Sequence, residues 1–569
     1  MALESRKKLR LGDILISHNV VTVEQLDEAL KRQKQSGDKL GEVLVRSHMC
    51  TEDAIAHALS DQLKIPTVEL AGRAIDEAVL NLIPSSMAKK YCAIPYSFSK
   101  ENANVLYVAM SDPMDMMALD DFSIVTNYQI EPRVATPSRI YAAIDRAYGA
   151  QDAMEVASKY ERERSELYGD EQDSRITEES AEVSNAPIVQ LVRTMIESAI
   201  RQRASDIHIE PMIEQIRVRY RIDGALYERM VYSTKLLAAI VARVKVLGGM
   251  DISEKRKPQD GRITQVVDRQ EYDIRVSTIP TVYGEKVVMR LASKNALMRS
   301  KSQLGLSEEE TKVFDEIFRH PHGIVLVTGP TGSGKSTTLY TALSELNKED
   351  VNIITVEDPV EANIDGINQI QVNPKAELTF ANALRSILRQ DPDIIMIGEI
   401  RDTETAEIAV QASITGHLVV STLHTNSTAI SVGRLVDMGV QPYLLSDALA
   451  GIIAQRLVRR LCPVCRRARQ PDEFERNLLC IGDDGEVQIY EPCGCPQCDN
   501  TGYRGRIGVY EMMKISPAIR RAVSVHATTE EIRDLALKEG LQTLRMGATR
   551  YVLDGITSLS EMMKVSFDI

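Results

Sequence analysis

A glycine-rich octapeptide near the middle of the chain constrains the fold more than any other segment. It reads Gly-Pro-Thr-Gly-Ser-Gly-Lys-Ser from Gly329 to Ser336, follows an apolar run at 324–327, and precedes a helical pattern that begins at Thr337. Glycines at this spacing let backbone N–H groups wrap a phosphate, while the lysine neutralises phosphate charge and the serine can ligate Mg²⁺. A chance glycine-rich turn would need neither the strand nor the helix. The predicted ATP-binding residues are Gly329, Pro330, Thr331, Gly332, Ser333, Gly334, Lys335, Ser336 and Thr337.

Apolar, strand-like runs alternate with helical stretches around this loop. The runs lie at 324–327, 353–356, 394–397 and 418–422. Short continuous apolar runs are typical of parallel strands that are buried on both faces. Their alternation with helices predicts an α/β fold, in which a mainly parallel sheet lies between helical layers.

Two glutamates are predicted at the sheet edge that carries the loop. Glu399 follows the run at 394–397 in the position of a Walker B carboxylate, where it can reach Mg²⁺ through water, with Ser336 as a second ligand. Glu357 ends the preceding run and is the candidate general base for the attacking water. Each glutamate taken alone could be a solvated loop carboxylate. With Lys335, the two glutamates form the core of the predicted catalytic set.

Two histidines flank the last of these runs. His417 precedes the run at 418–422 and His424 follows it. A histidine beside a γ-phosphate can sense the nucleotide state or bond to the metal-bound water, whereas a single histidine is more often structural. His424 joins the catalytic candidates, and the sequence leaves both alternatives open.

Length and charge limit the class of protein. A chain of 569 residues is too long for one core, and roughly three or four domains are expected. The net charge of −13 argues against nucleic acid as the principal partner. A membrane-spanning helix needs about 18 consecutive uncharged apolar residues, and no segment is that long. The amino-terminal residues turn polar too early for a secretory signal. We therefore expect a cytoplasmic protein.

Five of the eight cysteines crowd into a short segment near the carboxyl end. Cys462 and Cys465 form one Cys-x-x-Cys pair, and Cys495 and Cys498 form another. Each short loop can present two thiolates to one ion, so the pairs predict a tetrahedral Cys₄ zinc site of structural type, because four thiolates leave no open position. Cys493 is an extra thiol that could compete with Cys495.

The first 62 residues contain a repeat with a period of 29 residues. Two segments of 24 residues, 10–33 and 39–62, are separated by five residues. Apolar positions four apart predict a helix in each segment, with Thr22 and Thr51 as N-caps. The repeat therefore predicts two similar helical units side by side.

Four motifs together give the chain a family resemblance. VEDPVE at 356–361, Glu399, GHLVVSTLHTN at 416–426 and RASDIHIEP at 203–211 resemble the GspE/PilB secretion ATPase superfamily, in the branch of type II secretion and type IV pilus extension. The match runs from about residue 186 to 515. It implies a RecA-like motor domain and a homohexamer, and the zinc insert is similar to the one found in this branch.

The resemblance also implies arginine fingers in the domain that precedes the motor. Arg275 and Arg290 are the first candidates, and Arg219 and Arg221 rank second. An inserted arginine gives on the order of 10³ to 10⁵ in the rate of phosphoryl transfer. The commoner role of such arginines is that of surface-strand charges. Nearby, Asp206, His208 and Glu210 alternate on one strand and could mimic a metal site, but we favour an interfacial hydrogen-bonding role.

The helical repeat resembles the cyclic-di-GMP-binding domain of MSHA-type (MshE-like) pilus extension ATPases. By this resemblance Arg10 stacks on or pairs with the ligand, Gln33 and Gln62 bond to base edges, and Asp112 accepts from guanine. The chain departs from the family pattern at Asn19 and His48, which stand in place of glycine, and at Lys39, which replaces an arginine. The alternative is that the repeat serves packing in a docking domain. The remaining predicted contacts are Leu11, Gly12, Leu26, Leu30, Leu40, Gly41, Ile55 and Leu59.

These expectations give one picture of the whole chain. A Mg²⁺-dependent ATPase at the inner face of the cell membrane would drive an inner-membrane platform protein in pilus assembly, under cyclic-di-GMP control. A type II secretion motor is the alternative within the enzymes, and a signal-binding scaffold with weak hydrolysis is the alternative outside them. The predicted parts are an N-terminal domain at 1–149, a charged linker at 150–185, an arginine-bearing α/β domain at 186–300, the ATPase domain at 301–460, the zinc insert at 461–510 and a helical segment at 511–569.

Overall fold

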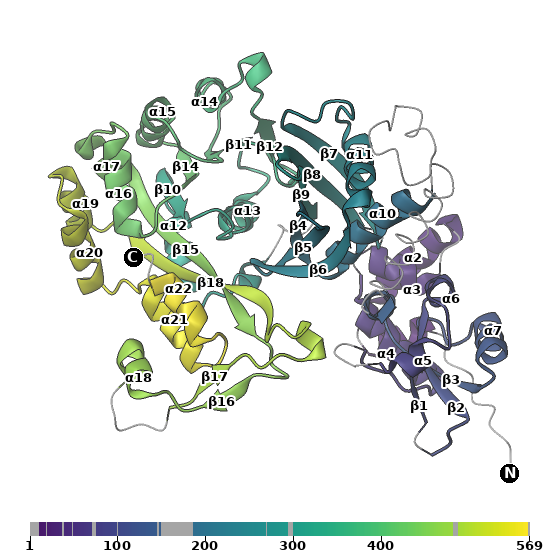
Figure 1. Cartoon of the computed structure of the whole chain (residues 1–569). Helices are drawn as coiled ribbons and strands as arrows, with labels where there is room; N and C mark the ends of the chain where they lie inside the picture. Colours follow the sequence, from purple (N-terminus) through teal and green to yellow (C-terminus); the bar gives the residue numbers. More distant parts are fainter. Residues whose placement is uncertain are drawn as a thin grey trace, which may run out of the picture. The chain divides into compact units, whose positions relative to one another are not determined.

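The computed structural model of the chain (Figure 1) forms two units, one of residues 1–269 with 274–291 and the other of 270–273 with 292–569. The six-part division predicted from the sequence is finer than this and stays a prediction. Arg10, Asn19, His48 and the linker at 150–185 lie outside the described residues. The structure describes residues 11–18, 20–36, 39–47, 49–70, 75–99, 101–144, 147–148, 186–268, 270–293, 300–481 and 487–566.

The amino-terminal repeat folds as two pairs of helices. Thr22 and Thr51 accept hydrogen bonds from backbone amides three residues on, so both predicted N-caps are present. Leu15 and Leu44, which occupy equivalent positions in the two halves, are fully buried in a shared core. The helices are α1 (Leu11–Ser17), α2 (Val23–Ser36), α3 (Leu40–Arg46) and α4 (Glu52–Leu63).

A small α/β subdomain follows the repeat in the first unit. Its sheet has the order β1-β2-β3, with β1 antiparallel and β3 parallel to β2. Phe122 and Leu106 are fully buried where helix and sheet meet. The elements are α5 (Glu77–Leu80), α6 (Ser85–Tyr91), β1 (Ala93–Phe98), β2 (Val105–Met110), α7 (Met116–Thr126) and β3 (Gln129–Val134).

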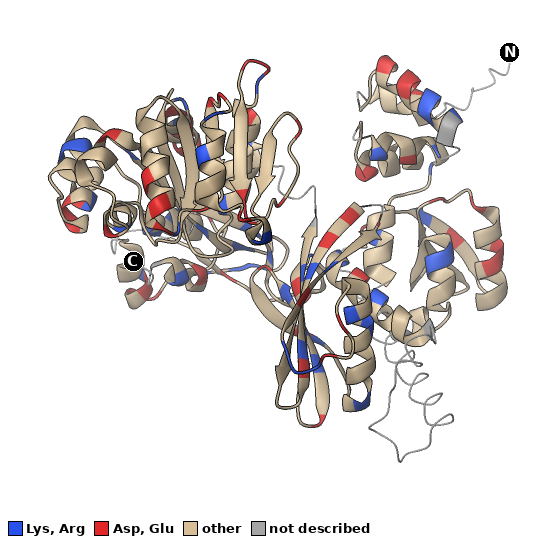
Figure 2. Ribbon diagram, turned by 90° about the horizontal axis from the view of Figure 1, so that it is seen from above, with Lys and Arg blue, Asp and Glu red and all other residues tan. Residues whose placement is uncertain are grey.

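The rest of the first unit is a six-stranded sheet of order β6-β5-β4-β9-β8-β7. On β4, Ile207 and Ile209 are fully buried, and α10 packs against that strand while α11 packs against β7. The alternate β4 residues Asp206, His208 and Glu210 are polar, and Figure 2 shows basic and acidic residues interspersed along this sheet. The elements are α10 (Ala186–Arg201), β4 (Ala204–Pro211), β5 (Gln215–Ile222), β6 (Ala225–Ser233), η1 (Thr234–Leu236), α11 (Leu237–Gly248), β7 (Gln259–Val267), β8 (Gln270–Thr281) and β9 (Gly284–Ser293).

The second unit is built on a seven-stranded sheet of order β12-β11-β13-β14-β10-β15-β18. Neighbouring strands from β12 to β15 pair in parallel, and β18 is antiparallel to β15. The predicted α/β fold with a mainly parallel sheet is therefore confirmed. The strands are β10 (Gly323–Thr328), β11 (Ile353–Glu357), β12 (Asn368–Gln371), β13 (Ile394–Ile397), β14 (Leu418–Leu423), β15 (Leu449–Leu461) and β18 (Tyr503–Lys514).

Helices cover both sides of this sheet, and one helix shows how the sequence starts them. Ser307 and Glu310 form a capping box, in which each side chain accepts from the backbone amide of the other. The helical elements are η2 (Lys301–Gln303), α12 (Glu308–Phe318), α13 (Lys335–Leu346), η3 (Pro374–Ala376), α14 (Phe380–Ile387), α15 (Thr403–Ile414), α16 (Thr428–Asp437), α17 (Pro442–Ala448), α19 (Pro517–Ser524), α20 (Thr529–Lys538), α21 (Leu544–Leu553) and α22 (Leu559–Ser566).

The cysteine-rich insert lies between β15 and β18. Both strands are long and belong to the main sheet, so the insert begins at Cys462 and the sheet resumes at Tyr503. No helix among the described residues is long and apolar enough to cross a membrane. The insert contains β16 (Arg467–Arg469), α18 (Glu473–Leu479), β17 (Ile489–Glu491) and η4 (Pro496–Cys498).

Candidate functional site

The glycine-rich octapeptide connects β10 to α13, at the carboxyl edge of the parallel sheet. Gly329, Gly332 and Gly334 have φ values of +150°, +80° and +91°, which L side chains rarely adopt. A Cβ atom on Gly329 would lie 2.5 Å from the carbonyl oxygen of Gln455, whereas one on Gly332 would meet no atom within 4 Å. Gly332 is exposed, so the loop leaves open space at its centre.

Lys335 begins α13 and turns back onto its own loop. Its Nζ donates to the carbonyl oxygens of Gly329 at 2.8 Å and Pro330 at 3.1 Å. Burial, opposed by Glu399 and aided by the neighbouring Arg456, lowers the pKa of Lys335 to about 8. The lysine is thus held at the loop by weak neutral acceptors, which a phosphate would replace with charged ones. Ser336 is exposed beside it and Thr337 is half-buried.

Glu399 lies beyond the end of β13, where an arginine and a histidine side chain approach it. Arg401 is 2.5 Å from Oε1, and Nε2 of His424 is 3.3 Å from Oε2. Oε2 is buried and accepts no hydrogen bond among the described residues. Together with the influence of Glu399 on the pKa of Lys335, these distances bring three predicted residues, Lys335, Glu399 and His424, to one place.

Glu357 is buried at the end of β11, and both of its carboxylate oxygens accept hydrogen bonds. Tyr340 donates to one oxygen, while Thr355 at 2.6 Å and Gln369 at 3.1 Å donate to the other. Burial and the nearby carboxylate raise the pKa of Tyr340, so its hydroxyl stays a donor. Glu357 is therefore held by three partners, and its role as general base stays a prediction.

The two histidines of the 416–426 motif lie at opposite ends of β14. Nδ1 of His417 is 2.8 Å from the carbonyl oxygen of Ala412 at the end of α15, and its backbone carbonyl accepts from Gly323. His417 therefore joins a helix end to the amino edge of the sheet. His424, at the carboxyl edge, is the one of the pair that reaches the nucleotide loop region.

Residues of β15 support the loop, and the sequence analysis did not identify them. Gln455 accepts from Thr338 of α13 at 2.7 Å, and its amide nitrogen lies against Gly334. Arg456 donates to Asn426 at 2.9 Å. These residues come from a strand more than a hundred positions after the loop, so only the parallel pairing of β10 with β15 brings them there. A strand-like apolar run at 449–454 was the signal that could have indicated them.

The four cysteines of the two Cys-x-x-Cys pairs form one cluster. Their Sγ atoms lie within 4.8 Å of one another, with separations of 3.8 Å for Cys462–Cys495, 3.8 Å for Cys465–Cys498 and 3.7 Å for Cys495–Cys498. Such distances are far too long for a disulfide, and they match the edge of a tetrahedron with metal–sulfur bonds of about 2.3 Å. Cys493 is exposed and is not a member of the cluster.

Backbone amides complete the surroundings of one sulfur. Sγ of Cys498 accepts from the amides of Cys495 at 3.2 Å and Gly502 at 3.1 Å. Amide donors of this kind stabilise a metal-bound thiolate. The donor set and its spacing therefore fit Zn²⁺.

The charged face of the six-stranded sheet in the first unit holds the arginines predicted as fingers. Arg290 donates to Asp206 at 3.2 Å, and Arg221 is 3.5 Å from the same carboxylate. Arg275 lies on β8 and is half-buried. The ion pair leaves Arg290 more than half exposed, so the guanidinium still faces solvent.

The alternating Asp206, His208 and Glu210 do not form a metal group among the described residues. Although burial opposes it, hydrogen bonds from Arg219 and Arg217 lower the pKa of Glu210 to about 2. Burial also lowers the pKa of His208. The two carboxylates are thus bonded to basic side chains, which agrees with the hydrogen-bonding role that we favoured over a metal site.

The predicted dinucleotide residues divide into packed and exposed sets. Leu11, Leu26, Leu40 and Ile55 are partly buried against the core of the repeat. A Cβ atom on Gly12 would lie 2.9 Å from the Leu26 side chain, and one on Gly41 would lie 3.1 Å from Ile55. Helix packing thus accounts for these residues without a ligand. The residues that remain at the surface or half-exposed are Leu30, Gln33, Leu59 and Gln62.

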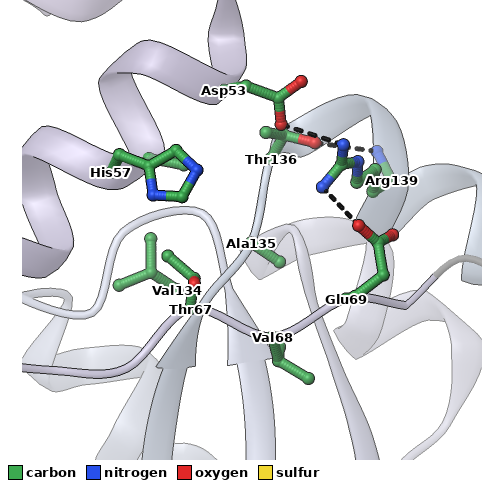
Figure 3. Close-up of a pocket in the computed structure, with 10 residues that line it drawn as sticks. Asp53, His57, Thr67, Val68, Glu69, Val134, Ala135, Thr136 and Arg139 are labelled. Atoms are coloured by element: carbon green, nitrogen blue, oxygen red, sulfur yellow. Dashed lines mark hydrogen bonds and ion pairs between the residues drawn. The ribbon is translucent and has the colours of Figure 1, made fainter.

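Lys39 and Asp112, predicted separately as ligand contacts, are paired with each other. Nζ of Lys39 is 2.5 Å from Oδ2 of Asp112, and this hydrogen bond raises the pKa of the lysine. The ion pair joins the second half of the repeat to the α/β subdomain. Arg139 adds a second link by pairing with Asp53 of α4 and Glu69, beside a cavity of about 110 Å³ (Figure 3).

Two models of known protein families match parts of the chain. The family model described as type II/IV secretion system protein matches residues 181–564, and the MshEN domain model matches residues 63–154. Among the predicted dinucleotide residues, Asp112 alone falls within the second range.

Two curated relatives and one solved structure illustrate the similarity. The type IV pilus assembly ATPase PilB of Myxococcus xanthus is 43% identical over 564 residues, covering 97% of this chain and 98% of that protein. The type II secretion system protein E of Xanthomonas campestris is 41% identical over 568 residues, covering 98% of each. The X-ray structure of the Yersinia pseudotuberculosis ATPase DotB has a TM-score of 0.51 and 22% identity, over 67% of this chain and 94% of that one, which is a likeness of fold.

Proposed function

The chain belongs to the type II/IV secretion system protein family, and from this premise we propose that it is the ATP-hydrolysing motor of a type IV pilus of MSHA-like type. The observation that carries the proposal is the meeting of Lys335, Glu399 and His424 at the glycine-rich loop. Full-length similarity to a pilus assembly ATPase supports the pilus assignment, and the MshEN match supports the MSHA-like type.

In this proposal the chain's own residues bind and position the nucleotide. The backbone amides from Gly329 to Ser336 cradle the phosphates, and Lys335 exchanges its two carbonyl acceptors for phosphate oxygens. Ser336, which is exposed, and the buried Oε2 of Glu399, which accepts no hydrogen bond among the described residues, fit an Mg²⁺ ion. When bound, ATP supplies the phosphoanhydride that is cleaved and Mg²⁺ neutralises its charge.

In this proposal Glu357 is the general base that accepts the proton of the attacking water. This carboxylate ends the strand next to β13, and Gly398 approaches it so closely that a Cβ atom there would lie 3.4 Å from the Cα of Glu357. The bonds from Thr355 and Gln369 keep the carboxylate oriented. Glu357 would act by exchanging one of its present donors for the water.

Arginines of a neighbouring domain complete the active site in this proposal. Arg275 and Arg290 would stabilise the charge of the transition state in a homohexamer, with Arg219 and Arg221 as second candidates. The exposure of Arg290 supports its place in this set, since a finger must leave its own strand to reach a phosphate. Arg219, in contrast, is held by Glu210 at 2.6 Å.

The zinc site is proposed to be structural. Four thiolate donors at tetrahedral spacing would hold the two ends of the insert together between β15 and β18. Metal analysis of the purified chain should find one zinc per chain, which is lost in Cys465→Ser and kept in Cys493→Ser. Zinc retained in Cys465→Ser would refute the assignment.

Cyclic-di-GMP is proposed as the regulator, and an inner-membrane platform protein as the driven partner. Leu30, Gln33, Leu59 and Gln62 offer an accessible apolar and amide surface on the repeat, which suits the edges and faces of guanine bases. The chain would work on the cytoplasmic side of the inner membrane through that partner. Packing explains the rest of the repeat, so the regulatory role is the first to test.

A type II secretion motor is the second candidate function. Type II secretion system protein E of Aeromonas hydrophila is 49% identical over 383 residues, a higher identity than that of the pilus relative but over 67% of this chain. The discriminating observation is whether genes beside this one encode pilins or a secretin-bound exporter.

Hydrolysis and calorimetry test the motor and the regulator separately. Phosphate release is measured for the wild type, Lys335→Ala and the exposed-lysine control Lys348→Ala, with and without cyclic-di-GMP. We expect turnover that Lys335→Ala lowers by about 10²- to 10³-fold and Lys348→Ala does not. Negligible turnover in all samples would refute the motor. Dinucleotide binding that Arg10→Ala leaves unchanged would refute the predicted ligand site while the motor stands.

A further inference from the structure

Helix α7 of the small α/β subdomain is apolar on two faces. Its inner face buries Ala118 and Phe122 against the sheet. Its outer side carries Met116, Met117 and Ile124, whose relative exposures are 64%, 73% and 79%. Met114 before the helix and Val125 within it are exposed as well. Met114, Met116, Met117, Ile124 and Val125 are called the α7 patch below.

An outward apolar face on a surface helix requires a physical account. A helix of a folded domain normally shows one apolar stripe toward the core and a polar face toward water. Single exposed apolar side chains are common, but five large ones exposed within twelve positions are a concentration of the kind that marks an interaction site. Figure 1 places α7 at the margin of its subdomain, beside β3.

Acidic side chains lie beside the α7 patch and between its members. No lysine or arginine occurs from 101 to 132, and four aspartates lie in the segment that leads into and along α7. Asp112 is paired with Lys39, and Asp121 lies 3.8 Å from Lys90. Asp115 caps the helix by accepting from Ala118, and Asp120 is exposed. The net charge around the patch therefore remains negative after its two lysine partners are counted.

Apolar side chains with acidic neighbours fit one kind of occupant. We propose that the α7 patch docks an amphipathic helix of a partner protein, whose apolar stripe is flanked by lysine or arginine residues. Methionines at three of the five positions adapt their shape to such a stripe, and the aspartates attract its flanks. An anionic membrane surface would be repelled by the same aspartates, and two copies of the patch would set like charges against each other.

A synthetic peptide pair tests the proposal on the full-length protein. One labelled helical peptide has a leucine stripe flanked by lysines, and its twin has glutamates in place of the lysines. Fluorescence anisotropy should show that the lysine peptide binds the wild type. Its affinity should fall at least tenfold in the double variant that combines Met117→Gln and Ile124→Gln. Phe474→Gln removes an exposed aromatic side chain from α18 in the other unit, and it should leave the affinity within twofold of the wild type.

Charge and fold are checked in the same experiment. Asp120→Asn should weaken the binding of the lysine peptide by a few-fold and reduce the salt dependence of that binding. The glutamine variant should keep the wild-type rate of ATP turnover, because neither position lies in the nucleotide site. Wild-type hydrogen exchange of the β1, β2 and β3 amides shows that its α/β subdomain is folded. Equal binding by the wild type and the glutamine variant would overturn the proposal. So would equal affinity for the glutamate peptide, or competition by vesicles of anionic lipid.

Discussion

The glycines of the nucleotide loop and those of the amino-terminal repeat both belong to sequence motifs but serve opposite physical purposes. Gly332 has a φ of +80° and faces open space, so it is required by backbone conformation and by room for a ligand. Gly12 lies in a helix, and the space where its Cβ would be is filled by Leu26. The first kind of glycine indicates binding, whereas the second indicates close helix packing.

The largest effect is expected at the back of the nucleotide loop. In Gly329→Ala the new Cβ would lie 2.5 Å from a backbone oxygen of Gln455, which cannot move without shifting β15. We expect nucleotide affinity to fall about 100-fold, equivalent to about 2.7 kcal/mol. Titration with a fluorescent nucleotide measures this, and Gly433→Ala, where the nearest atom is 3.6 Å away, is the control. If Gly329→Ala bound the nucleotide with wild-type affinity, the steric explanation for this glycine would be wrong.

The repeat should respond in stability and not in nucleotide binding. Gly12→Ala places a methyl group 2.9 Å from Leu26, and overpacking should cost more than alanine gains as the better helix former, for a net loss of about 1 kcal/mol in the repeat. Hydrogen exchange of the α1 and α2 amides measures the loss. Gly41→Ala, with 3.1 Å to Ile55, should cost less. If Gly12→Ala instead abolished dinucleotide binding with unchanged exchange, the glycine would belong to the ligand site.

A pH titration sharpens the role of the loop. The pKa of Lys335 is about 8 in the free protein, and a bound phosphate raises it. Nucleotide affinity should therefore be constant below pH 8 and fall as pH rises above it, by up to about tenfold per unit. Lys335→Arg stays charged throughout and should show no such fall. An affinity that is flat to pH 9.5 in the wild type would contradict the lowered pKa.

The smallest effect separates backbone strain from ligand contact. Gly332→Ala and Gly416→Ala both place alanine at a positive φ, of +80° and +115°, with no atom within 4 Å of the new Cβ. Each should cost about 1 kcal/mol in stability. The KM for ATP should rise about fivefold in Gly332→Ala alone, because Gly416 adjoins His417 at the other edge of the sheet. Equal KM values in the two variants would mean that the loop centre does not face the nucleotide.

The strands that carry the nucleotide site were predictable because their signal is local. The run expected at 394–397 is β13 without a shift, and that expected at 418–422 is one residue shorter than β14. A buried parallel strand is a continuous apolar run, and the side chain that follows it must lie at the sheet edge. Such reasoning is enough to bring Lys335 and Glu399 to the same edge.

Contacts between distant segments were beyond the reach of local patterns. The hydrogen bond from Tyr340 to Glu357 and the one from Thr338 to Gln455 depend on the order of strands, which the sequence pattern leaves undetermined. The pairing of Lys39 with Asp112 depends on how the repeat rests on the α/β subdomain. Long strands were also missed where charged residues interrupt the apolar run, as at Arg459 and Arg460 of β15.

Strand β15 has a mechanical consequence. It touches the nucleotide loop at Gln455, whose amide nitrogen lies against Gly334, and it ends one residue before Cys462 of the four-cysteine cluster. An extended backbone is close to its maximum length, so the strand resists stretching between these two points. Its pairing with β18 is irregular between Arg459 and Leu461, and this is the place where the strand can yield. A displacement of the loop along the strand axis is therefore passed toward the cysteines, less what this irregularity absorbs.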